Sequence, residues 1–124
     1  MLRFVWCYNT SIHFICKDFL FSLILNFRIV KELTDLLCLD LFDKQFITES
    51  ITLYIGYSKG LCQSTGGTAR FRTATNMPDI IQPEIERLYR EKAVRSIPIR
   101  RINLSCNNVI SESYETYYTY YPNK

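Results

Sequence analysis

Basic side chains are the residues in this sequence best placed to do chemistry, and they are unevenly distributed. Residues 56–101 carry nine Lys and Arg against four Asp and Glu, whereas residues 1–55 and 102–124 each carry one more acid than base. Guanidinium and ammonium groups bind phosphates without reading a base sequence. A basic segment in a chain with a net charge of only +3 therefore indicates a polyanionic partner.

The segment 99–106 (IRRINLSC) positions two of these cations. Its apolar residues recur with the period of two that is typical of a half-buried strand. The alternate positions are polar and should face solvent: Arg101, Asn103 and Ser105. Arg100 stands at the strand entry, where the chain must turn for its side chain to join them.

Two earlier segments alternate in the same way. Residues 50–58 (SITLYIGYS) predict one strand, and residues 68–73 predict another that places Arg70 and Arg72 on its outward side. Residues 59–67 lie between them and hold three of the four glycines, so they should form a hairpin turn.

Two helices complete the pattern. Apolar residues at helical spacing predict one helix over residues 28–42, with this buried stripe: Ile29, Leu33, Leu36 and Leu37. A second helix is expected over residues 80–93, with Pro83 in its first turn and this stripe: Ile81, Ile85, Leu88 and Tyr89.

These elements predict an α+β fold with a four-stranded, mainly antiparallel sheet and two helices on one face. The other face of the sheet would then be polar and basic. We expect the folded domain over residues 28–110, preceded by an irregularly patterned region over 1–27 that could supply a first strand and followed by an exposed tyrosine-rich tail over 111–124.

This arrangement resembles the C-terminal little finger domain of Y-family translesion DNA polymerases, of the UmuC/ImpB/MucB/SamB-like group in its Gram-positive form. Four stretches carry the resemblance: LTDLLC (33–38), SITLYIGYSK (50–59), GGTAR (66–70) and PIRRINLSCNNV (98–109). It extends from about Arg28 to Glu115 and degrades before Arg28.

The resemblance implies a DNA-binding domain that takes part in translesion synthesis, DNA repair and the SOS response. Its partner would be double-stranded primer–template DNA, held by its backbone with the sheet in the major groove. The residues expected to contact DNA are Arg100 and Arg101 first, then Arg70, Arg72, Ser58, Lys59, Asn103 and Ser105.

Catalysis is not expected of this chain. Nucleotidyl transfer needs carboxylates that hold two metal ions, and the acids Asp35, Asp40 and Asp43 fall on or beside an amphipathic helix, where they should be solvated. The palm, fingers and thumb of the family have no counterpart in the sequence. No metal or cofactor site is expected either, because the five cysteines are scattered and His13 is the single histidine.

Neither a membrane span nor export is expected. The longest apolar run, residues 19–27, is too short to cross a bilayer, and scattered thiols are typical of a reducing cytoplasm.

The tail suggests a second partner. In the family this region often carries a short peptide that binds the sliding clamp, and Thr116, Tyr117 and Tyr120 occupy the corresponding positions in a degenerate form. Two alternatives to DNA binding therefore stay open: a protein-interaction module that contacts the clamp or a parent polymerase, and a non-functional product of a truncated gene.

Overall fold

The computed structural model describes residues 3–8, 10–20, 23–58, 62–94 and 97–111. It contains these elements in order: β1 (Arg3–Tyr8), β2 (Ser11–Leu20), α1 (Leu23–Lys44), β3 (Phe46–Tyr57), β4 (Thr65–Thr75), α2 (Pro78–Lys92) and β5 (Ile99–Ser111).

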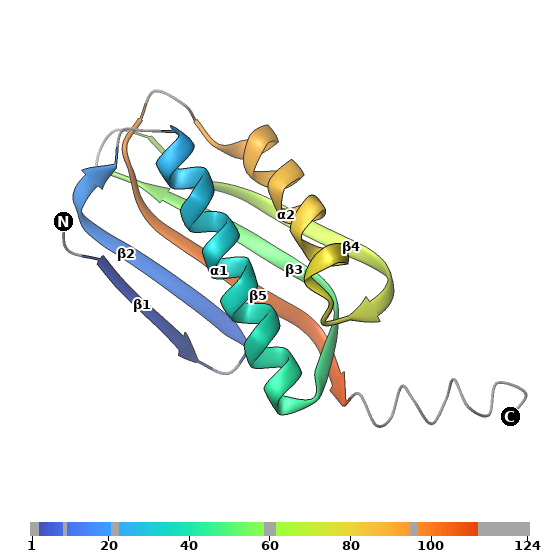
Figure 1. The fold of residues 1–124 in the computed structure, drawn as a ribbon. Helices are drawn as coiled ribbons and strands as arrows, with labels where there is room; N and C mark the ends of the chain where they lie inside the picture. Colours follow the sequence, from blue (N-terminus) through green and yellow to red (C-terminus); the bar gives the residue numbers. More distant parts are fainter. Residues whose placement is uncertain (1–2, 9, 21–22, 59–61, 95–96, 112–124) are drawn as a thin grey trace, which may run out of the picture.

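The strands form one antiparallel sheet in the order β1-β2-β5-β3-β4 (Figure 1). Its four strands β2, β5, β3 and β4 make the predicted sheet, and β1 adds a fifth strand at the edge. β5 lies at the centre although it comes last in the chain, because the link through α2 returns it between β2 and β3. The fold class expected from the sequence is confirmed.

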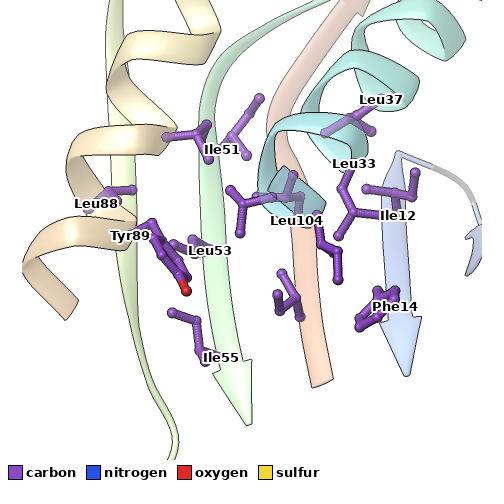
Figure 2. Packing of buried hydrophobic residues seen from close by; sticks show 14 of the residues in the cluster. Ile12, Phe14, Leu33, Leu37, Ile51, Leu53, Ile55, Leu88, Tyr89 and Leu104 are labelled. Carbon is purple, nitrogen blue, oxygen red and sulfur yellow. The ribbon is translucent and has the colours of Figure 1, made fainter. Parts of the chain in front are cut away.

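Both helices cover the same face of the sheet (Figure 1). Between the two layers lies the core, to which β3 contributes Ile51, Leu53 and Ile55, all at most 1% exposed (Figure 2). Ile102 and Leu104 of β5 are completely buried in it, as their alternation predicted. Ile12 and Phe14 of β2 extend the same core under α1. Because the helices cover one face of the sheet alone, the opposite face is uncovered, and it forms the open face of the domain.

The two helices differ in how well the sequence predicted them. All four residues of the predicted α2 stripe are buried. In α1, Leu36 was wrongly assigned to the buried stripe, since it is 45% exposed, whereas Val30 and Leu41 are buried. The helix also begins at Leu23, five residues before the predicted start, because residues 23–27 (LILNF) are nearly all apolar and show no periodicity. It ends at Lys44, and the next residue, Gln45, has a positive φ of 58° and donates its N–H to the Phe42 carbonyl.

Candidate nucleic-acid interface

The open face of the sheet carries rows of hydroxyl and amide side chains. One row runs across four strands in the order Thr68, Thr52, Ser105 and Ser11. The hydroxyl oxygens of Thr52 and Thr68 lie 2.9 Å apart, and Ser11 donates to Ser105 over 3.0 Å. These bonds hold short side chains flat against the sheet, so a partner can approach the backbone closely.

A second row lies two residues farther along the strands on the same face. Asn103 is flanked by Tyr54 of β3 and His13 of β2. The Tyr54 ring is partly exposed, and its hydroxyl lies 2.6 Å from the Ser64 hydroxyl. The turn before β4 is thereby tied to the open face.

A β-bulge brings Arg100 and Arg101 onto this face together. Gly56 pairs with Arg101 but the next residue, Tyr57, pairs with Ile99, so Arg100 is the extra residue on β5. A bulge of this kind re-aims side chains and interrupts the strict alternation of a strand. Both arginines are consequently exposed, whereas Ile99 on one side and Ile102 on the other are buried.

Arg100 and Arg101 line a hollow of about 340 Å³ at this end of the face. The same hollow is lined by the following residues: Ile15, Tyr54, Gly56, Tyr57, Cys62 and Ser64. It combines two cations with hydroxyl groups that can donate hydrogen bonds, which is the composition of an anion site.

Arg70 and Arg72 form a separate pair. Arg70 lies on the open face opposite Ser50, in the last pair before the register of β3 and β4 shifts. Arg72 is exposed two residues farther along β4, beyond Phe71, which packs toward the core. Ser50 and Gly56 stand about 20 Å apart along β3, at roughly 3.3 Å per residue. The structure therefore does not gather the four arginines into one cluster but places one pair at each end of the face.

The charges of the two faces contrast. Nearly all the acids whose side chains are described lie on the helices: Glu32, Asp35, Asp40, Asp43, Asp79, Glu84, Glu86 and Glu91. Three cations in that layer, Lys31, Lys44 and Arg87, are paired with them. Arg87 bonds to both Glu84 and Glu91, and its pKa rises through those hydrogen bonds. Among the described residues, none of the four arginines of the open face makes an ion pair. Their charge is thus available to a partner.

The remaining predicted contact residues fall into two groups. Ser58 is only 5% exposed, and both its N–H and its hydroxyl point at the Pro98 carbonyl, so it anchors the start of β5 instead of presenting a free hydroxyl. Lys59, Thr116, Tyr117 and Tyr120 lie outside the described residues.

Besides the two arginines, none of the residues that line the hollow was predicted as a site residue, and two of them, Tyr54 and Ser64, carry hydroxyl groups on the open face. Tyr54 could have been found, because it alternates outward on the same strand as Thr52. Ser64 gave no signal, since it belongs to a turn whose path the sequence does not specify.

Within the described ranges, His, Cys, Asp and Glu side chains form no group of three that could hold a metal ion. No helix in the same part of the chain is long and apolar enough to cross a membrane.

Comparison with known families settles the affiliation of the chain. The sequence model of the impB/mucB/samB family C-terminal domain matches residues 27–117. The chain belongs to this family. The resemblance to a Y-family polymerase C-terminal domain is therefore confirmed, and the matched range contains the whole open face except β1 and β2.

Solved structures show the same fold. A structure titled "Complex of beta-clamp processivity factor and little finger domain of PolIV" superposes on this impB/mucB/samB-type domain with a TM-score of 0.56. The match covers 82% of this chain and 86% of the other at 8% sequence identity. Among curated proteins, no sequence matches.

Proposed function

We propose that this domain is the non-catalytic DNA-binding part of a Y-family polymerase, and that the open face of its sheet holds the backbone of duplex DNA. One observation carries the proposal: four exposed arginines of the sheet form no ion pair within the described part of the chain, while nearly all the acids with described side chains lie in the opposite, helical layer. Such a charge distribution directs a polyanion to one side of the molecule.

The separation of the two arginine pairs suits a duplex. The major groove of B-form DNA is about 12 Å wide, so phosphates on its two sides lie farther apart than that. Arg100 and Arg101 at one end of the face can meet one backbone, and Arg70 and Arg72, about 20 Å away along the strands, can meet the other. Between the two arginine pairs, the short side chains of the hydroxyl row project little from the sheet, so the sheet can enter the major groove.

Contacts of this kind do not distinguish sequences, because they are made to phosphates. That property suits translesion synthesis and DNA repair, in which a polymerase must hold DNA whatever base or lesion lies at the primer end. The chemistry of synthesis would be supplied by other domains.

The test is binding of the whole chain to a fluorescein-labelled primer–template duplex, followed by anisotropy at several salt concentrations. Affinity should be weak, equal for unrelated sequences and steeply reduced by salt. The double variant R100A/R101A should lose most of the binding, and the matched control R28A/R90A should not, since Arg28 and Arg90 are exposed on α1 and α2 in the opposite layer. Equal affinities for the two variants would refute the proposal.

Clamp binding is the second candidate. Its support is the solved relative, which is described as a complex with the beta clamp, together with the position of Thr116, Tyr117 and Tyr120 in the tail. The test is titration of the full chain onto a purified beta clamp. Substitution of Tyr117 and Tyr120 by Ala should abolish the binding, whereas R100A/R101A should leave it unchanged.

A further inference from the structure

The outer surface of the helix layer carries an apolar groove that the DNA-binding proposal does not use. It lies between the C-terminal half of α1 and the start of α2, and its volume is about 450 Å³. Leu39 and Phe42 line it from α1, and Met77 and Pro78 line it from the other side. The first three are 57%, 62% and 51% exposed, so large apolar side chains stand together in solvent.

Such a cluster has a free-energy cost when it is uncovered. Each large apolar side chain that stays in water forgoes the stabilisation that burial would give it, and contiguous exposed apolar surface usually marks an interaction site. The described elements do not cover this groove. Its occupant must therefore be another segment of the chain or a partner.

The tail of the chain begins beside the groove. β5 ends at Ser111, which pairs with Phe46 at the start of β3. The Phe46 carbonyl accepts a hydrogen bond of 3.1 Å from the side chain of Asn76, which itself lines the groove. On the α1 side of the groove, the Phe42 carbonyl accepts a hydrogen bond from the N–H of Gln45, and Gln45 directly precedes Phe46. The end of β5, the end of α1 and the start of α2 also lie at one end of the molecule in Figure 1.

We propose that the tyrosine-rich segment 112–124 of the same chain docks into this groove. Fully extended, thirteen residues reach about 40 Å, which is far more than the distance from a strand end to its neighbouring helix. A short tether gives an effective concentration in the millimolar range, so a weak site would be filled. Tyrosine fits the site chemically, because its ring can cover Leu39 and Met77 while its hydroxyl stays at the rim, where the Asp35 carboxylate offers an acceptor.

Electrostatics does not drive this docking. The rim carries Asp35, and the tail carries Glu112 and Glu115 close to its start. Like charges repel, and salt screens the repulsion. Docking of the tail should therefore be unchanged or strengthened by salt, whereas DNA binding at the open face should be weakened by it.

The methionines provide a probe of the groove. The chain has two, Met1 and Met77, so ¹³C-methyl methionine labelling of the full chain gives two signals, one of them from the groove itself. In one variant all five tail tyrosines are replaced by Ser: Tyr114, Tyr117, Tyr118, Tyr120 and Tyr121. Loss of their rings from the groove should shift the Met77 methyl signal and leave the Met1 signal in place.

A reciprocal experiment follows the tail. F42S should speed cleavage of the tail by chymotrypsin, which cuts after tyrosine. The matched control is L36S, because Leu36 is a similarly exposed residue of α1 that does not line the groove. Both positions are exposed, so the fold should tolerate both changes.

The outcomes separate the occupants. A Met77 shift that depends on the tail and is independent of protein concentration, with faster cleavage in F42S than in L36S, supports the proposal. A Met77 signal that ignores the tail tyrosines overturns it. A shift that grows with concentration means that a second copy supplies the tail, and this also overturns docking within one chain.

Discussion

Gly56 lies directly opposite Arg101 on neighbouring strands, and a Cβ atom placed on Gly56 would stand 3.4 Å from the Cβ of Arg101 and 3.4 Å from the Tyr54 ring. The glycine has no unusual backbone angle, so its role is spatial. Its missing side chain leaves space between the ring of Tyr54 and the side chain of Arg101, both of which line the hollow.

A larger side chain at position 56 should therefore weaken DNA binding without lowering the stability of the fold. G56V adds two methyl groups between Arg101 and Tyr54, and we expect it to weaken DNA binding by roughly two- to tenfold, or up to about 1.4 kcal/mol. Its stability should not fall, because valine favours strands and glycine costs backbone entropy. G56A is the control, since its single Cβ makes only an ordinary contact and should leave affinity close to that of the wild type. Anisotropy and urea unfolding measure the two properties. Weaker binding in G56V that is matched by a loss of stability would contradict this explanation.

Arg101 should contribute one phosphate contact. The slope of log affinity against log salt is about −0.9 per phosphate neutralised on duplex DNA. R101A should make the slope shallower by about one such contact and weaken binding to all sequences equally, as a backbone contact requires. R28A in the helix layer should leave the slope unchanged. An unchanged slope in R101A, with the fold intact, would mean that this face does not meet DNA and would favour the protein-interaction alternative.

The sequence predicted those elements whose two sides differ in polarity. Alternation in residues 50–58 and 99–106 identified β3 and β5, although β5 continues to Ser111. Where both sides are apolar the pattern disappears, and so β1, β2 and the first turns of α1 could not be delimited. In β2 the buried Ile12 and Phe14 alternate with Ser11 and His13, but the half-buried Ile15 breaks the pattern.

The candidate site was predictable in part for the same reason. Arg70 and Arg101 follow from parity, because each belongs to the last pair of a regular ladder before the register shifts. The position of Arg100 depends on a bulge, and the burial of Ser58 depends on its bonds to Pro98. The position of Arg100 and the burial of Ser58 both depend on the register between β3 and β5. That register pairs residues far apart in the chain, and a single sequence does not specify it.

Gly66 is required by the backbone at the start of β4. Its φ is 155°, and a Cβ there would collide with the Leu53 carbonyl oxygen of the neighbouring strand and lie 3.2 Å from the Tyr54 Cα. G66A should therefore cost at least about 2 kcal/mol of unfolding free energy, because strained backbone and a backbone clash add. G67A is the matched control, since its Cβ would meet the flexible ends of Leu88 and Lys92 at 3.1 and 3.5 Å. Urea unfolding should rank G66A well below G67A, and equal losses would show that the turn before β4 adjusts.

Stability should fall in alkali because two cysteines are buried. Burial, helped by the Asp35 charge, raises the pKa of Cys38 from 9.0 to about 12, and burial likewise raises the pKa of Cys106 to about 12. Between these values the unfolded chain loses the thiol protons while the folded chain keeps them. The unfolded state then binds fewer protons, so the free energy of unfolding is undiminished below pH 9 and decreases as the pH rises toward 12.

The double variant C38A/C106A isolates this effect. It should be less stable than the wild type at pH 7, because two side chains are shortened in the core, but its stability should fall less steeply with pH above 9. Part of the slope should remain, since burial also raises the pKa of Tyr89 to about 12. Urea unfolding at pH 7 to 11 measures both curves, and each must be recorded with reductant present so that exposed thiols do not form disulfides. Parallel curves would show that the two thiols do not ionise differently in the folded and unfolded states.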